Sequence, residues 1–460
     1  MFNPGPPRKP RIGAGPSEAR ADGRRLTHAG EIASVRRNIR TGAPYMTLSS
    51  PRSRADTCVL LLEGINDSAV ALMQASGYTN LVRLPKALDR EALHEAIRGV
   101  HILGIRSRTQ LDEAAFAHAD RLLAVGCFSV GTNQVDLEAA RARGIPVFNA
   151  PFSNTRSVAE LVIGEIVMLL RRITPRSVGA HAGEWDKSAT GSVEVRGKTL
   201  GIVGYGNIGT QLSTLAEAMG MRVIFYDHTD RLRHGNTEPV ESLAELLAQA
   251  DVVSLHVPET DATANMIGAS EIAQMKRGAY LINNARGTVV DLDALAAALA
   301  SGHLAGAAVD VFPKEPGSNA ERFVSPLQGL PNVILTPHIG GSTVEAQERI
   351  GSEVARKLVD YADTGATVGT VNFPQAFIST RPGGARFAHL HRNLPGVLGR
   401  INDVFARSGI NIAGQILQTD GDLGYVVIDT DAGLADPDAV LRELAAIEGT
   451  VRARLLYERT

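Results

Sequence analysis

The chain has 460 residues, of which 44% are hydrophobic and 21% are charged, values typical of a protein with two to four domains of about 100–200 residues. Its formal charge of −2 argues against a dedicated nucleic-acid-binding protein, and no apolar run reaches the roughly 20 residues of a membrane helix. The two cysteines and the scattered histidines form neither a disulfide framework nor a metal-ligand pattern. We therefore expect no metal site and a location in the reducing cytoplasm.

The N-terminal segment differs in composition from the rest of the chain. Residues 1–45 are rich in Pro, Gly and Arg and show no apolar periodicity, so they cannot bury enough surface to offset the entropy of ordering. We predict a disordered leader over residues 1–56 with no catalytic role. It lacks the apolar core of a secretory signal. A transit peptide is disfavoured by its acids and prolines, and translation from Met46 is the simpler alternative.

The first folded part is predicted to be a parallel α/β unit. Short apolar runs at 58–62, 101–105, 122–125 and 145–148 predict strands, and the patterns at 68–76 and 92–97 predict helices. Short buried strands that alternate with helices are typical of βαβ crossovers and a parallel sheet.

A second α/β series follows a long apolar helix predicted over residues 158–170. Strands are predicted at 199–203, 222–226, 251–257, 279–282, 306–311 and 333–335, with helices at 208–219, 243–247 and 292–299. This alternation predicts a doubly wound sheet. A further helix is predicted to begin near Ser342 and to run to Tyr361, away from that sheet.

The C-terminal part changes pattern. Strands at 386–391, 410–417, 425–429 and 450–456 and helices at 396–408 and 437–447 are predicted in the order βαββαβ. That order is the ferredoxin-like arrangement, so we expect a separate small regulatory or binding module.

A glycine motif joins the first strand and helix of the second series. Gly204, Gly206 and Gly209 form GxGxxG directly between the predicted strand and helix, which is the context that a dinucleotide site requires. Asp227 ends the next strand, where a carboxylate can accept hydrogen bonds from ribose hydroxyls and repel a 2′-phosphate. The motif therefore predicts NAD rather than NADP. A plain turn is the alternative.

Three chemically active side chains follow other strands of the same predicted sheet. Arg286, Glu315 and His338 each lie just beyond a strand, where ligands meet open α/β sheets. A cation there can bind a carboxylate, and a His paired with a carboxylate can exchange protons near neutral pH. Alone, each would more readily be read as a structural or surface residue.

Two arginines end a strand of the first series. Arg106 and Arg108 flank Ser107, and a spacing of two in an extended segment puts both on one side. They could clamp an anion, although solvated edge arginines are an equally good reading. Asn154 precedes a helix and could be only its cap.

At this point the sequence resembles a known family. Residues 57–460 are similar to the bacterial D-3-phosphoglycerate dehydrogenases, within the D-isomer-specific 2-hydroxyacid dehydrogenases, in the form with a C-terminal ACT domain. The matching segments are Gly126–Asp136, Phe148–Leu161, Gly204–Gly209, Asn284–Asp291 and Leu335–Ser342. One departure is Asn284, where the family more often has a small residue, and we expect it to alter packing and not chemistry.

The resemblance implies the domains and the roles of individual residues. The fold would contain two Rossmann-like domains and an ACT domain, with a substrate-binding domain at 57–153, an NAD-binding domain at 154–339, a return to the substrate-binding domain with a linker at 340–383, and the ACT domain at 384–460. The catalytic residues would be Arg286, Glu315 and His338. The NAD-binding residues would be Gly204, Gly206, Asn207, Ile208, Gly209, Asp227, Asn284, Ala285, Arg286, Asp310, His338, Ile339, Gly340 and Gly341, and the substrate-binding residues Arg106, Ser107, Arg108 and Asn154. An L-serine effector would contact His391, Asn393 and Asn411.

The implied activity is NAD-dependent oxidation of 3-phospho-D-glycerate to 3-phosphooxypyruvate, which begins serine biosynthesis, with feedback by L-serine. Reduction of 2-oxoglutarate would be a side activity. Family members are commonly homotetramers, and Trp185 lies in the segment that reaches across a subunit contact. The alternatives are another D-2-hydroxyacid dehydrogenase, which the two arginines disfavour, and a non-catalytic NAD-sensing protein.

Overall fold

The computed structural model describes residues 53–459 except 317–320, 380–382 and 432. Residues 1–52 of the predicted leader lie outside the described part of the chain. The end of the predicted leader is ordered, because Arg54–Asp56 form a 3-10 turn and Arg54 forms an ion pair of 2.9 Å with Asp363. The ordered chain thus begins before residue 57, where the apolar pattern starts.

The first sheet has five parallel strands in the order β2-β1-β3-β4-β5. Its strands are β1 (Val59–Leu61), β2 (Leu81–Arg83), β3 (Ile102–Ile105), β4 (Ala124–Cys127) and β5 (Val147–Phe148), and its helices are α2 (Asp67–Ala75), α3 (Arg90–Ala96), α4 (Glu113–His118) and α5 (Leu137–Ala142). The predicted strands are all present. The sequence pattern missed β2, which is a short and half-exposed edge strand, and the six-residue helices α4 and α5.

The second sheet has seven parallel strands in the order β12-β11-β10-β9-β6-β7-β8. They are β6 (Thr199–Val203), β7 (Arg222–Tyr226), β8 (Glu238–Pro239), β9 (Val252–Leu255), β10 (Ala279–Asn283), β11 (Leu304–Val309) and β12 (Val333–Leu335). The helices are α6 (Thr155–Leu170), α7 (Ile173–His181), α8 (Asn207–Ala218), α9 (Leu243–Gln249), α10 (Ala269–Gln274) and α11 (Leu292–Ala300). The strand order reverses between β6 and β9, so this is the switch point at which doubly wound sheets bind ligands.

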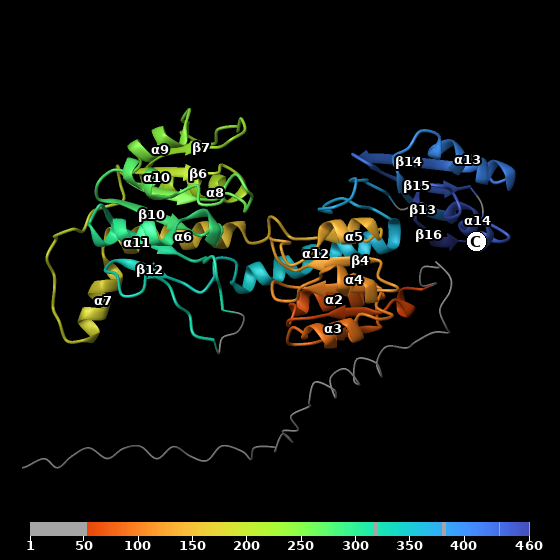
Figure 1. Cartoon of the computed structure of the whole chain (residues 1–460), viewed down its shortest axis with the longest axis horizontal. Helices are drawn as coiled ribbons and strands as arrows, with labels where there is room; N and C mark the ends of the chain where they lie inside the picture. The colour runs from red at the N-terminus through yellow and green to blue at the C-terminus, as the bar shows by residue number, and fades with distance from the viewer. Residues whose placement is uncertain (1–52, 317–320, 380–382, 432, 460) are drawn as a thin grey trace, which may run out of the picture.

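The chain passes between these two sheets twice, after β5 and after β12. On the return it forms α12 (Val344–Thr364), whose apolar face joins the core of the first sheet through Ile350, Val354 and Leu358. Figure 1 shows α12 beside β4 and α2, away from the second sheet. Both connecting segments therefore join the first sheet to the second, and strand ends of both sheets carry the predicted site residues.

The third sheet is antiparallel, in the order β14-β15-β13-β16. It contains β13 (Gly384–Arg392), β14 (Ile412–Asp420), β15 (Leu423–Thr430) and β16 (Thr450–Arg459), with helices α13 (Val397–Arg407) and α14 (Pro437–Ala445). It lies beside the layer of the first sheet (Figure 1). Arg141 on α5 pairs with Asp422 at 3.0 Å, and Arg452 donates to the Leu122 carbonyl at 2.8 Å. The predicted fold class, two doubly wound α/β units and a βαββαβ module, is confirmed.

Candidate active site

The glycine turn between β6 and α8 is shaped for close approach of a ligand to the backbone. Gly204 has φ of 90°, and a Cβ there would lie 2.5 Å from the His256 carbonyl oxygen at the end of β9. A Cβ at Gly209 would lie 2.5 Å from the Gly204 oxygen, whereas one at Gly206 would have no atom within 4 Å. Gly206 caps α8 without a side-chain bond, and Asn207 and Ile208 follow it. The turn therefore leaves amide groups at a helix N-terminus open to an anion.

Asp227 closes one side of this turn. Its Oδ2 accepts from the Tyr205 amide at 2.9 Å, its Oδ1 accepts from Thr229, and Arg231 lies 3.2 Å away. Partial burial would raise the pKa of this carboxyl, but the hydrogen bonds from Thr229 and Tyr205 outweigh that effect and hold the pKa below its usual range. A charged carboxylate thus lies directly beside the glycine turn.

His338 and Glu315 form a hydrogen-bonded pair. The His338 Nδ1 lies 3.0 Å from both Glu315 carboxylate oxygens, and about half of the imidazole surface is exposed. A carboxylate only accepts, so Nδ1 carries the hydrogen and Nε2 of the neutral ring is left as the basic atom. The hydrogen bond to Glu315 raises the pKa of His338. Burial acts against ionisation of Glu315, but the His338 hydrogen bond leaves the pKa of Glu315 below its usual range.

The loop that carries His338 is held by Asp310. Asp310 follows β11 and is 1% exposed, and its carboxylate accepts from the Thr336 hydroxyl at 2.6 Å and from the amides of Ile339 and Gly340 at 2.8 Å. These bonds keep His338 in the left-handed region, at φ of 55°. The resemblance implies a direct NAD contact for Asp310, and that contact stays a prediction. In the structure both of its oxygens are bonded to its own chain, so its visible task is to shape the loop.

Arg286 follows β10 and lies near the His338–Glu315 pair. Its charge acts on both members of the His338–Glu315 pair, lowering the pKa of each. Its Nη1 donates to the Ala285 carbonyl at 2.7 Å, and a Cβ at Gly131 would lie 3.3 Å from its Nη2. Arg286 therefore extends from the second sheet toward a loop that follows β4 of the first.

Asn284 points into the protein. Its Nδ2 donates at 2.9 Å to Oε2 of Glu165, which is 2% exposed on α6. Burial raises the pKa of Glu165 to about 8. The Asn284 side chain thus packs against α6, and the NAD contact that the resemblance implies for this residue stays a prediction. The sequence offered no sign of Glu165, which is hidden in an apolar helix.

The loop after β4 links the two groups of strands. The Gln134 side chain donates to the Arg106 carbonyl at 2.5 Å, and the Asn133 side chain donates to Glu259 at 2.7 Å. Glu259 also accepts from Thr288, two residues after Arg286, at 2.8 Å. The strand end that carries Arg106–Arg108 is thus connected to the one that carries Arg286. No sequence pattern had indicated a connecting role for these residues.

Asn154 is the N-cap residue of α6, but its side chain makes no capping bond. Its Oδ1 is buried and has no hydrogen-bond partner among the described residues, and its Nδ2 would lie 2.7 Å from a Cβ at Gly341. A plain cap is therefore excluded. A buried amide oxygen without a partner is uncommon in a folded protein, so Asn154 has a polar group that the described residues leave unused.

The structure does not bring the predicted effector residues together within one chain. Asn393 bonds to the β14–β15 turn at Gly421, whereas Asn411 bonds to Asp431 beyond the far end of β15. Because β15 is eight residues long, the two asparagines lie at opposite ends of the third sheet. His391 is buried, and its Nδ1 lies 3.3 Å from Nδ1 of His389.

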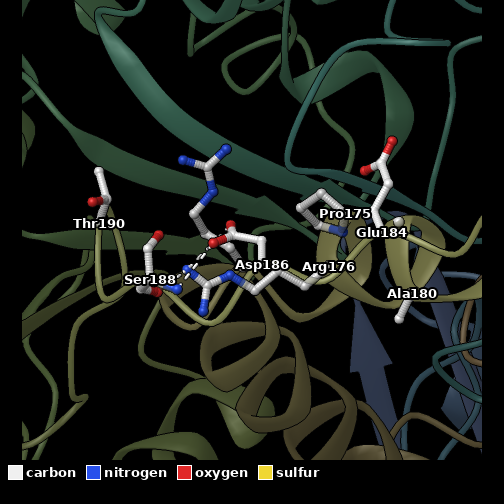
Figure 2. A pocket seen from close by; sticks show the side chains of 9 residues that line it. Pro175, Arg176, Ala180, Glu184, Asp186, Ser188 and Thr190 are labelled. Atoms are coloured by element: carbon white, nitrogen blue, oxygen red, sulfur yellow. Dashed lines mark hydrogen bonds and ion pairs between the residues drawn. The ribbon is translucent and has the colours of Figure 1, made fainter.

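A pocket beside α7 is separate from the strand-end site. It lies between α7 and residues 184–190, and Arg172, Arg176, Glu184 and Asp186 are among its lining residues (Figure 2). None of the predicted catalytic, cofactor or substrate residues lines it. Arg176 donates to the Ser188 carbonyl at 2.5 Å, and Trp185 nearby is 86% exposed.

None of the helices traced over residues 53–459 combines the length and apolarity of a membrane span. No three His, Cys, Asp or Glu side chains in the described ranges are grouped to hold a metal ion. Cys58 and Cys127 are free and buried, and burial raises the pKa of each thiol to about 12.

Most of the chain is similar to known proteins. Residues 163–340 match the NAD-binding domain of the D-isomer specific 2-hydroxyacid dehydrogenases, and residues 387–452 match the ACT domain of the AHAS small subunit-like type. Proteins named D-3-phosphoglycerate dehydrogenase from Haemophilus influenzae and Escherichia coli are each 57% identical over 398 residues, covering 86% of this chain and 97% of theirs. The solved D-lactate dehydrogenase of Aquifex aeolicus, in complex with NAD and lactic acid, is 29% identical with a TM-score of 0.62, covering 69% of this chain and all of its own.

Proposed function

Because the chain belongs to the D-isomer specific 2-hydroxyacid dehydrogenase family, we propose that it oxidises 3-phospho-D-glycerate to 3-phosphooxypyruvate with NAD, the first step of L-serine biosynthesis. The observation that carries the proposal is the 57% identity to proteins named D-3-phosphoglycerate dehydrogenase along 97% of their length. The His338–Glu315 pair and Arg286, at the strand ends of an NAD-binding fold, supply suitable chemistry.

The residues present fit NAD. The amides beside Gly206 lie at an open helix N-terminus that can take a pyrophosphate, and the Asp227 carboxylate can accept from the ribose hydroxyls. When bound there, NAD would accept the hydride that leaves C2 of the substrate.

The chain's own residues would control the proton and the charges. His338 Nε2 takes the hydroxyl proton, and Glu315 stabilises the imidazolium that results. Arg286 binds the carboxylate and the developing carbonyl oxygen. Arg106 and Arg108 hold the phosphate, Ser107 lies between them, and Asn154 donates to a substrate oxygen from its amide NH2 group.

A rival function is that of another D-2-hydroxyacid dehydrogenase with an uncharged substrate tail, and a second is a non-catalytic NAD-sensing protein. The deciding experiment measures initial rates of NADH oxidation with phosphohydroxypyruvate, hydroxypyruvate, pyruvate and 2-oxoglutarate. We expect kcat/KM to be highest for phosphohydroxypyruvate, with slower turnover of 2-oxoglutarate. Equal rates with pyruvate would support the first rival, and no turnover of any substrate would support the second.

The choice of NAD depends on Asp227. Replacing Asp227 by alanine should weaken discrimination against NADP by about tenfold or more, because it removes a carboxylate that repels the 2′-phosphate while Arg231 remains. The measurement is the ratio of kcat/KM for NADH and NADPH. Asp230→Ala is the matched control, since it removes a nearby exposed charge. A wild-type ratio near one would contradict this role for Asp227.

Regulation and assembly complete the proposal. We infer that L-serine binds between the ACT domains of two chains, with His391 and Asn393 from one and Asn411 from the other, because one chain holds the asparagines at opposite ends of its sheet. The exposed Trp185 segment would form another contact, giving a cytoplasmic homotetramer. Sedimentation tests the assembly.

The two-chain site makes a specific prediction for effector binding. Asn393→Ala and Asn411→Ala should each weaken calorimetric binding of L-serine by about tenfold, since each removes hydrogen bonds to one ligand. If wild type neither binds nor responds to millimolar serine, the regulatory part of the proposal is wrong and the catalytic part is unaffected.

A further inference from the structure

A buried carboxylate lies directly beneath the arginine-bearing loop. Glu63 follows β1 and is 9% exposed, and its Oε1 accepts from the backbone amides of Arg106 at 3.1 Å and Thr109 at 2.9 Å. Its Oε2 accepts from the Arg108 amide at 3.0 Å. One side chain thus holds three amide groups of a four-residue loop that is 43 to 46 residues away in sequence.

The backbone of Glu63 is in an unusual conformation. Its φ is 61°, in the left-handed region that non-glycine residues occupy at a cost. The turn is fixed by the Glu63 amide, which donates to the Lys86 carbonyl at 3.2 Å, and by the Gly64 amide, which donates to the Leu84 carbonyl at 2.9 Å. This conformation directs the side chain from the end of β1 to the end of β3, its neighbour in the sheet.

The three bonds decide how the loop can bind an anion. Successive amide groups in a turn often form an anion-binding concavity, but here the amides of Arg106, Arg108 and Thr109 are already bonded to Glu63. Those three amides are therefore not open to a substrate anion, and the guanidinium side chains are the charged groups of the loop that can bind one. Their direction depends on the loop backbone, which Gln134 also holds at the Arg106 carbonyl.

We propose that Glu63 is a positioning residue, whose buried carboxylate fixes the loop of residues 106–109 so that Arg106 and Arg108 face the anionic tail of the substrate. This rests on the proposed function, because it assumes a phosphorylated substrate. Glu63 does not itself touch the substrate. Its effect is selective for the substrate tail, since the His338–Glu315 pair and the glycine turn belong to the other sheet.

The test is the Glu63→Gln variant, which keeps the size of the side chain but replaces one accepting oxygen by an NH2 group that faces a backbone amide. We expect KM for phosphohydroxypyruvate to rise about tenfold or more, because small displacements of positioning groups are costly. The values of kcat and of Kd for NADH should stay within about threefold, and KM for hydroxypyruvate should change less than about threefold. Glu63→Asp, which keeps the charge on a shorter stem, should shift KM in the same direction by less, and it replaces the first variant if that one does not fold.

Two further variants distinguish a positioning role of Glu63 from a general loss of stability. Asp112→Ala removes the N-cap of α4 in the same layer, so it should lower the melting temperature without changing the ratio of the two KM values. Arg108→Ala should raise KM selectively for phosphohydroxypyruvate, and adding Glu63→Gln to it should have less than the full additional effect, because both changes act on one group.

Several outcomes would overturn the inference. A Glu63→Gln enzyme with an unchanged KM ratio, or with equal losses for both substrates, shows that Glu63 does not position the clamp. An Arg108→Ala enzyme without a selective effect overturns the clamp itself and Glu63 with it. If wild type does not reduce phosphohydroxypyruvate at all, the proposed function is what fails.

Discussion

Replacement of His338 by alanine should lower turnover by about 10²–10⁴-fold, the usual contribution of a general acid–base group. In the structure Nδ1 is engaged by Glu315, so Nε2 is the atom that can take or give the substrate proton. Alanine offers no proton carrier at that position. The measurement is kcat for phosphohydroxypyruvate reduction, together with the Kd for NADH from fluorescence titration, which should stay within a few-fold.

The matched control for this variant is His118→Ala. His118 lies in the last turn of α4, in the layer of the first sheet, where its Nδ1 contacts Arg98. That replacement should leave turnover near wild type. Unchanged turnover in His338→Ala would end the assignment of His338 as the acid–base group, and a parallel loss of NADH binding would point to collapse of the loop that Asp310 holds.

The parts of the site that sequence analysis predicted are those with a local pattern. The glycine turn, Asp227 and the strand-end residues Arg286 and His338 stand at fixed offsets from apolar strands, and parallel strands bring their carboxyl ends to one edge. The same locality explains most of the fold, since nearly all strands and most helices of the second and third sheets followed from short periodic runs, whereas helices α7 and α10 were not predicted. The edge strands β2 and β8 were not predicted from the sequence, because neither has a buried apolar face.

The residues that were missed act through contacts that are distant in sequence. Glu63 reaches a loop more than 40 residues away, Gln134 reaches Arg106, and Glu165 on α6 reaches Asn284. Each is an isolated polar residue in or beside an apolar segment, so its partner can be identified only when the strands are placed side by side. Asp310 shows the converse, because its position at a strand end was visible whereas its bonds to the His338 loop were not.

The residues that we propose as effector contacts show a third limit. Their positions at the ends of strands were predictable, but whether they share a site depends on strand register. The antiparallel pairing of β14 and β15 separates Asn393 from Asn411 within the chain. A site that uses both must therefore be completed by a second chain.

Replacement of Glu315 by glutamine should lower turnover by about 10–100-fold and move the pH dependence of activity to lower pH. The hydrogen bond and charge of Glu315 raise the pKa of His338, so a neutral side chain of the same size lets that pKa fall. The imidazolium formed during oxidation also loses its partner carboxylate, which weakens proton transfer.

The sign of the shift is the same in both reaction directions. Reduction requires protonated His338, so its rate is full below the pKa and is lost as the pH rises through it. In Glu315→Gln that loss begins at lower pH. Oxidation requires neutral His338, so its rate rises with pH through the same pKa, and in the variant the rise also comes at lower pH.

The measurement is kcat/KM in both directions between about pH 5 and pH 10, since this ratio reports groups of the free enzyme. Glu345→Gln is the control, because it removes one exposed carboxylate from the first turn of α12, a short distance after the His338 loop. Its pH profile should coincide with wild type. The pH profiles of Glu315→Gln could instead coincide with those of wild type, or shift in opposite directions for the two reactions. In either case the group that titrates is not His338, and the acid–base group is another residue at these strand ends.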